Sequence, residues 1–140
     1  MGRRCSGLRL DFDLAKPIYM QIVDEVKRCI VRGELGPGEK MLSQREMAQS
    51  LKVNPNTVQR AYQEMERLEL VETLRGEGTF VKNDVMLVKK LREEMASETL
   101  HSFLREMASL GFSESEVVQM VSESLGNGGS REYAGGEANA

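Results

Sequence analysis

Polar side chains gather where one predicted helix begins, in the stretch NPNTVQR at residues 54–60. Amide side chains, here those of Asn56 and Gln59, can pair with adenine, and arginine can pair with guanine. Pro55 suits the first helical position because no backbone N–H is needed there, and Asn54 is then the N-cap. The free N–H groups and the positive dipole end of a helix N-terminus also attract phosphate. This stretch therefore has the chemistry needed to contact a nucleic acid.

Residue sets that would support catalysis or metal binding are missing from the sequence. The single histidine, His101, and the two cysteines, Cys5 and Cys29, are too few for a metal site or a disulfide framework. There is no phosphate-binding loop and no Ser/His/Asp arrangement that the sequence can justify. We therefore predict no enzyme activity, no metal and no cofactor, with His101 on the surface and Cys29 buried on a helix.

Three helices are predicted around the polar stretch. The first helix has Pro17 at its first helical position and ends at Gly33, and its apolar residues recur at spacings of three and four. The second helix opens with the capping box SQRE at residues 43–46. The third helix begins after Asn54, and its predicted buried face consists of Val58, Ala61, Tyr62, Met65 and Leu68.

After the third helix the apolar period changes from 3.6 to 2. The segments LVETL and GTFV alternate, and the two glycines of RGEG at residues 75–78 allow a tight turn, so a β-hairpin is predicted. A longer helix, a pair of short helices and a hairpin describe a winged helix-turn-helix, a fold that is mostly α with a small β-hairpin. In a helix-turn-helix the second paired helix enters the major groove with its N-terminal residues against base edges. The predicted contact residues are Asn54, Asn56, Thr57, Gln59 and Arg60.

The charge distribution favours the front half of the chain as the part that binds an anion. The net charge of −3 argues against nucleic acid, but residues 1–83 carry 14 basic and 12 acidic residues, a net of +2, and residues 84–140 a net of −5. Simpler interpretations of the same residues stay open. Asn54 would be a cap only, Asn56 and Gln59 a solvated helix face, and RGEG a hairpin turn without any contact. Arg45, exposed on the second predicted helix, would form a surface ion pair with a neighbouring glutamate. The rival function is a winged helix used for protein–protein contact without DNA.

The segment from Pro17 to Val81 resembles the DNA-binding domain of the GntR family of bacterial transcriptional regulators. The motifs REMA, VNPNTVQRAYQEME and GTFV stand in the order and spacing of that family. The short remainder is similar to the YtrA subfamily, whose members have a small helical C-terminal region instead of a large ligand-binding domain.

The resemblance implies further site residues. The arginine of the second helix corresponds to Arg45 and would contact phosphate or a base. The wing tip corresponds to Arg75, Gly76, Glu77 and Gly78, with Thr79 on the returning strand, and such wings reach toward the minor groove. This chain departs from the family pattern at Leu42, where proline is usual, and at Glu77, where arginine or lysine is common. An acidic wing tip repels phosphate and disfavours deep insertion of the wing.

The C-terminal part is predicted to form two helices. A helical pattern over residues 84–110 ends at Gly111, and a capping box at residues 113–116 opens a helix whose predicted buried residues are Val117, Val118, Val121 and Leu125. Two helices make a poor core, so they either pack on the winged domain or pair with another chain. The subfamily resemblance favours pairing as a homodimer.

The predicted organisation follows from these segments. An N-terminal arm covers residues 1–16, the winged helix-turn-helix 17–83, a helical dimerisation region 84–125 and a disordered, Gly-rich tail 126–140. Without a signal-peptide core or a membrane-length apolar run, the protein is predicted to be cytoplasmic. The resemblance implies a dimeric repressor of its own operon and adjacent genes, transporter genes among them. It would bind double-stranded DNA at an inverted repeat and respond to a small-molecule effector if it has one.

Overall fold

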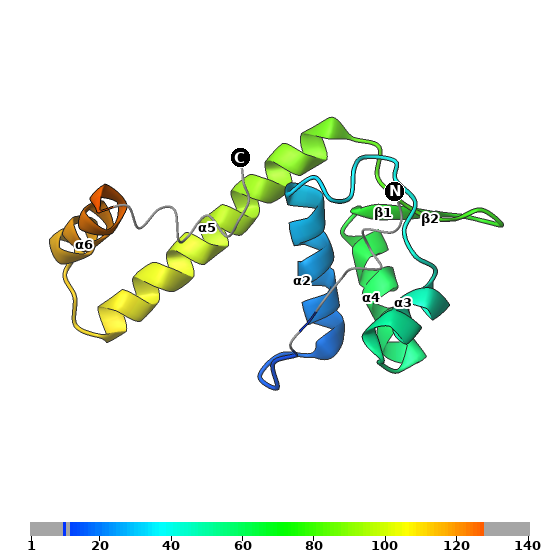
Figure 1. Cartoon of the computed structure of the whole chain (residues 1–140), viewed down its shortest axis with the longest axis horizontal. Helices are drawn as coiled ribbons and strands as arrows, with labels where there is room; N and C mark the ends of the chain where they lie inside the picture. The colour runs from blue at the N-terminus through cyan, green and yellow to red at the C-terminus, as the bar shows by residue number, and fades with distance from the viewer. Residues whose placement is uncertain (1–9, 11, 128–140) are drawn as a thin grey trace. The chain divides into compact units, whose positions relative to one another are not determined.

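A computed structural model describes residue 10 and residues 12–127 of the chain (Figure 1). The chain divides into two compact units after Glu94, which lies within helix α5, beyond the expected start of the C-terminal region at residue 84. Most of the predicted N-terminal arm lies outside the described residues, as does the predicted tail from residue 128 onward.

Helix α2 of the first unit runs from Ile18 to Val31 and turns its apolar face inward. Gly33 follows it with a φ of 81°, the left-handed conformation expected of a residue that ends a helix. The prediction that Pro17 is the first helical residue was wrong by one position. Its ψ of 139° is extended, so Pro17 occupies the N-cap position instead. Cys29 is buried in this helix as predicted, and burial raises the pKa of its thiol to about 12.

Helices α3 and α4 form the helix-turn-helix. Helix α3 spans Gln44–Leu51 and opens with the predicted capping box: the Ser43 hydroxyl accepts the Glu46 N–H at 3.1 Å, and the Glu46 carboxylate accepts the Ser43 N–H at 2.9 Å. Lys52, with a φ of 58°, makes the tight turn to α4 at Pro55–Arg67. The Tyr62 hydroxyl of α4 donates to the Leu42 carbonyl at 2.5 Å and so ties α4 to the segment before α3.

The predicted buried face of α4 is confirmed except at its end. Val58, Ala61, Tyr62 and Met65 are buried. Leu68 keeps 36% of its surface exposed because α4 ends at Arg67 and the chain then turns through Glu69, whose φ is 61°.

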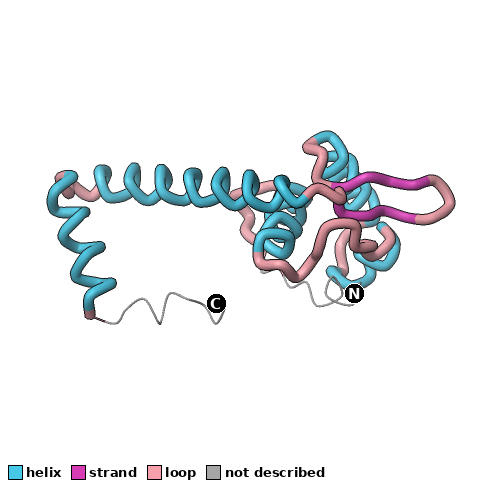
Figure 2. Tube along the Cα trace, turned by 90° about the horizontal axis from the view of Figure 1, so that it is seen from above, coloured by secondary structure: helices cyan, strands magenta, loops and turns pink. Residues whose placement is uncertain are grey.

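The β-hairpin has the predicted form. Strands β1 (Val71–Leu74) and β2 (Gly78–Val81) are antiparallel, with Val71 opposite Val81 and Leu74 opposite Gly78. Figure 2 shows the hairpin in magenta, extending beyond the helices that it follows in this unit. The segment before α3 runs along β2, where the Met41 N–H donates to the Thr79 carbonyl at 2.8 Å.

The core of the first unit lies between α2, α4 and the base of the hairpin. Helices α2 and α4 lie side by side (Figure 1) and pack through their buried faces. The largest fully buried side chains come from all of these elements and the connecting segments: Ile22, Val26, Ile30, Leu35, Met47, Val58, Tyr62, Met65, Val71 and Val81. Helix α5 (Val85–Ser109) begins in this unit and adds the buried Leu91.

The second unit consists of the later part of α5 and helix α6 (Glu114–Gly126). Gly111, with a φ of 93°, makes the turn, and the predicted capping box between Ser113 and Glu116 is present. Val117 is buried, but Val118, Val121 and Leu125 are 65%, 40% and 53% exposed. The prediction that all four are buried was therefore wrong within one chain, because two helices can cover only part of each other's apolar surface. No helix in the described part of the chain is long and apolar enough to span a membrane.

Candidate nucleic-acid interface

The start of α4 is fixed by the predicted cap. The side-chain oxygen of Asn54 accepts the backbone N–H of Asn56 at 2.7 Å, and Pro55 is the first helical residue. Because the oxygen is used in this bond, the NH₂ group is the part of the Asn54 side chain that can still donate to a ligand. The capping interpretation is thus correct, and it is compatible with a contact at the same position.

Helices α3 and α4 together form a shallow surface recess of about 750 Å³. It is lined by Gln44, Arg45, Ala48, Gln49, Val53, Pro55, Asn56 and Gln59. The structure therefore brings three predicted site residues, Arg45, Asn56 and Gln59, onto one surface from two helices. Gln44 and Gln49 belong to the same surface and were missed, although their exposed positions on the predicted second helix could have indicated them.

Arg45 is an exposed residue in the first turn of α3. The carboxylate of its neighbour Glu46 is bound to the Ser43 N–H in the capping box. Arg45 forms no salt bridge with any described residue. The surface ion pair that sequence reasoning left open is therefore not formed in this part of the chain.

The other two predicted residues of α4 do not line this recess. Thr57 is half-buried, and its backbone N–H donates to the Asn54 carbonyl at 2.9 Å. Arg60 is exposed, and its guanidinium carbon lies 4.1 Å from the ring centroid of Tyr19 in α2. Arg60 thus extends from α4 toward α2, whereas Asn56 and Gln59 share the recess with α3.

The β-hairpin is the wing of the fold, and its tip at residues 75–78 exposes Arg75, Gly76 and Glu77. Thr79 is 8% exposed and its hydroxyl lies 3.3 Å from that of Thr73, so the side chain faces the sheet and not the solvent. Gly78 has a φ of 128°, a conformation that residues with a side chain rarely adopt.

Lys40 lies alongside β2, next to the tip of the wing, and was missed by sequence reasoning. A Cβ atom placed on Gly78 would be 2.9 Å from the Lys40 Cε atom, which shows how closely the lysine passes. Lys40 is exposed and forms no salt bridge with the described residues. Lys40 and Arg75 therefore place two positive charges near the wing tip, against the one negative charge of Glu77. No local sequence signal marks Lys40, because its place depends on the pairing with β2.

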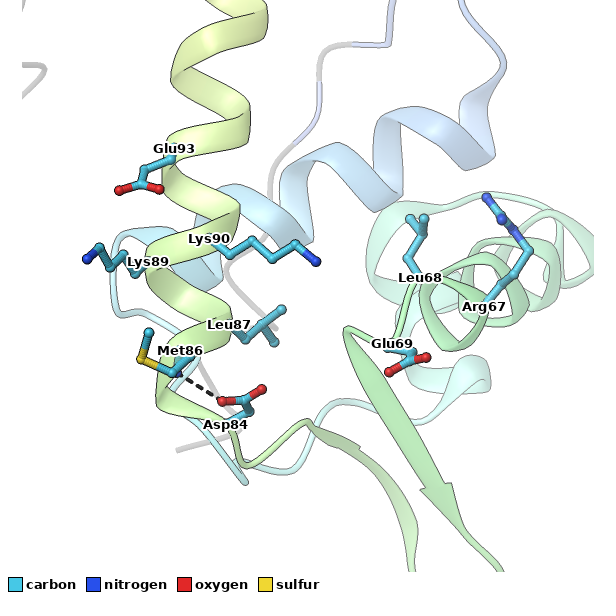
Figure 3. A pocket seen from close by; sticks show the side chains of 9 residues that line it. All are labelled: Arg67, Leu68, Glu69, Asp84, Met86, Leu87, Lys89, Lys90 and Glu93. Carbon is cyan, nitrogen blue, oxygen red and sulfur yellow. Dashed lines mark hydrogen bonds between the residues drawn. The ribbon is translucent and has the colours of Figure 1, made fainter.

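A second recess of about 610 Å³ lies at the opposite end of α4, beside the start of α5 (Figure 3). Its lining is Arg67, Leu68, Glu69, Asp84, Met86, Leu87, Lys89, Lys90 and Glu93. Figure 3 shows the Lys90 side chain extending toward Leu68, with Lys89 pointing away. Three basic and three acidic residues line it, so the lining favours neither anions nor cations. The described residues contain no cluster of metal-ligating side chains.

Comparisons with known proteins connect this geometry to a family. Residues 18–81 match the family described as bacterial regulatory proteins, gntR family. The chain is 47% identical over 110 residues to the HTH-type transcriptional regulator YhcF of Bacillus subtilis, covering 79% of this chain and 91% of YhcF. It is 42% identical over 77 residues to the HTH-type transcriptional repressor YtrA of the same organism, covering 55% of this chain and 59% of YtrA. A solved GntR family transcriptional regulator from Listeria monocytogenes has a TM-score of 0.74 and 39% identity, with 80% of this chain and 98% of that chain covered.

Proposed function

The chain belongs to the gntR family of bacterial regulatory proteins, in the YtrA subfamily, and is a DNA-binding transcriptional regulator; from this premise we propose that it is a homodimeric repressor that binds an inverted-repeat operator. The alternative, a winged helix that contacts only proteins, is not favoured, since the relatives are transcriptional regulators. The regulated DNA lies in the cytoplasm, which is the proposed place of action.

The observation that carries this proposal is the polar surface shared by α3 and α4. Asn56 and Gln59 are exposed near the start of α4, and Arg45 lies beside them on the same recess. With α4 in the major groove, the two amides can pair with base edges while Arg45 donates to a phosphate. Of the other predicted residues, Asn54 can donate through its NH₂ group and Arg75 through the wing tip, whereas Thr79 is buried and is the weakest candidate.

The second unit supports the proposal of a dimer. Large apolar side chains stay exposed along it, namely Leu100, Phe103, Leu104, Leu110, Phe112, Val118, Met120, Val121 and Leu125. An apolar groove of about 440 Å³ within this unit is lined by Phe103, Met107, Met120, Val121, Ser124 and Leu125. Extended apolar surfaces of this kind are typical of protein interfaces. A second copy of the same unit offers a matching apolar surface around a two-fold axis.

Dimerisation would also explain how a DNA-binding unit whose residues 1–83 have a net charge of only +2 could bind DNA tightly. Joining two DNA-binding units makes the second contact intramolecular, which can raise the overall affinity by about 10² to 10⁴. A two-fold dimer matches an inverted repeat whose half-site centres are about 10 base pairs apart. An effector bound in the second unit would release DNA by changing the spacing of the two α4 helices. The name of the relative YtrA, a transcriptional repressor, supports repression. We propose the protein's own operon and adjacent genes, transporter genes among them, as its targets.

The test is a binding titration with DNA from upstream of the chain's own gene. Fluorescence anisotropy with a labelled duplex, an excess of unrelated competitor and increasing salt should show a specific complex. Its affinity should fall steeply with salt, because Lys and Arg release counterions from phosphate. Equal affinity for the upstream duplex and for shuffled sequences of the same composition would contradict sequence-specific regulation at that site.

A further inference from the structure

Arg60 of α4 lies over an aromatic ring that comes from a different helix. The distance between the guanidinium carbon of Arg60 and the ring centroid of Tyr19 is 4.1 Å, which is well within the range of a cation–π contact. Tyr19 lies in the first turn of α2 and is half-buried, whereas Arg60 is exposed. The contact thus joins the helix proposed to enter the DNA groove to the helix that supports it.

The acidic residue at the right spacing to form an ion pair with Arg60 is bound to another arginine. Glu64 lies four residues after Arg60 on α4, the spacing at which a helical ion pair forms. Its two carboxylate oxygens instead accept bonds from Arg67, at 3.0 Å from Nε and 2.5 Å from Nη2. These bonds hold the pKa of the Glu64 carboxyl below its ordinary value. Arg60 also contributes to lowering the Glu64 pKa through its charge, but it forms no salt bridge with any described residue, and its close contact is with the Tyr19 ring.

The ring contact leaves the hydrogen-bonding capacity of Arg60 unused. A cation–π contact consumes no N–H donor, so all five donors of the guanidinium can still bind an acceptor. The fork of an arginine matches a phosphate, which it binds through two parallel bonds. Arg60 lies outside the recess that holds Asn56 and Gln59, on the side of α4 toward α2. For an α4 inserted in the groove with Asn56 and Gln59 toward the base edges, a partner on the side toward α2 would be the sugar–phosphate backbone.

We propose that Tyr19 is a positioning residue for DNA binding, whose ring holds the Arg60 guanidinium ready to donate to a phosphate of the operator backbone. This inference rests on the proposed insertion of α4 in the DNA groove. A free arginine side chain has many rotamers and loses that freedom when it binds, so a side chain held in advance binds more tightly. The typical strength of an exposed cation–π contact corresponds to about a two- to fivefold change in affinity for each half-site.

The experiment is a double-mutant cycle with Tyr19→Leu, Arg60→Met and the double variant, together with Tyr19→Phe. Each full-length variant is titrated by fluorescence anisotropy against the upstream duplex over a range of salt. Tyr19→Leu should weaken binding about two- to fivefold per half-site in the wild-type background and should have no further effect beside Arg60→Met. Tyr19→Phe keeps the ring and should bind like the wild type. Arg60→Met should lower the salt slope by about one unit for each phosphate that the arginine neutralises, and Tyr19→Leu should shift it in the same direction.

Controls separate this role from a general effect on folding. Met20, the next residue of α2, is 39% exposed and has no aromatic ring, so Met20→Ala should leave both affinity and salt slope unchanged. Thermal unfolding of every variant shows whether it is folded at the assay temperature. If Tyr19→Leu unfolds there, Tyr19→Met, with an unbranched side chain, replaces it in the cycle.

Three outcomes would overturn the inference. Equal weakening by Tyr19→Leu with and without Arg60→Met would mean that Tyr19 acts through packing alone. A drop in affinity with Tyr19→Phe as large as with Tyr19→Leu would assign the effect to the hydroxyl. Unchanged affinity for Tyr19→Leu would remove any role for the ring. A wild-type protein that binds no specific duplex would instead refute the proposed function, which keeps the two failures distinct.

Discussion

Placing a charge in the apolar groove of the second unit should separate two copies of the chain. Val121 lines this groove and is 40% exposed in a single chain, and in the proposed dimer a second copy covers it. In the variant Val121→Asp each dimer would bury two carboxylates, because a two-fold interface contains every substitution twice. Disrupting a residue at the centre of an interface lowers the binding free energy by about 2 kcal/mol or more. Two copies therefore weaken dimerisation by about 4 kcal/mol, or about 10³-fold.

The effect on DNA binding follows from the separation of the two DNA-binding units. A monomer keeps its affinity for one half-site but forfeits most of the increase of about 10² to 10⁴ that linkage provides on a full operator. Sedimentation velocity would measure the dimer directly, and anisotropy with full-site and half-site duplexes would measure the two affinities. The expected pattern is a monomeric variant with normal half-site affinity and weak full-site affinity.

The control adds the same charge to the same helix outside the groove. Gln119 of α6 is exposed and its amide donates to Glu123 at 3.0 Å. Gln119→Asp should stay dimeric and bind the full operator like the wild type. If Val121→Asp also sediments as a dimer with unchanged operator affinity, the groove of the second unit is not the dimer interface, and the reasoning from its exposed apolar side chains is wrong.

Three further predictions concern the surface proposed to contact DNA. Asn56→Ala or Gln59→Ala should relax base preference at particular operator positions, at a cost of about 1–3 kcal/mol each, and an unchanged preference in a selection from random sequences would exclude these amides from base contact. Arg45→Ala should weaken binding to all sequences and lower the salt slope by about one unit for each phosphate that Arg45 neutralises, so an unchanged slope in a salt titration would place Arg45 away from the backbone. Glu77→Arg should tighten non-specific binding, most clearly at low salt, because it removes a like charge near the phosphates; no increase in affinity in the same titration would place the wing tip away from DNA.

Local signals explain what could be predicted from the sequence. The capping boxes at Ser43 and Ser113, the cap at Asn54 and the helix end at Gly33 all depend on contacts or backbone angles within a few residues. Such interactions form wherever the chain is helical, and the sequence pattern contains both partners. The hairpin turn at Gly76 belongs to the same class.

Features that depend on distant partners could not be predicted in this way. Lys40 lies beside Gly78 near the wing tip because its segment pairs with β2, and Tyr19 meets Arg60 because α2 packs against α4. In both cases the two partners lie far apart in the sequence, and no sequence motif contains both of them. The apolar periodicity of α6 predicted a buried face, but Val118 is 65% exposed because α5 covers only part of that face within one chain.

The local charge pattern shows how a chain with a net charge of −3 can still present a surface that attracts DNA. Three acidic side chains of this unit are held in bonds: Glu46 in the capping box, Glu64 by Arg67, and Glu72 of β1 in a 3.8 Å ion pair with Lys82. Glu77 at the wing tip is exposed and is an exception. The cations Lys40, Arg45, Arg60 and Arg75 form no salt bridge with the described residues. Because screening limits charge effects to about 10 Å, a phosphate at the recognition helix responds to these nearby cations more than to the total charge of the chain. The overall charge of a chain is therefore a poor guide to DNA binding when the charges near the recognition helix are arranged in this way.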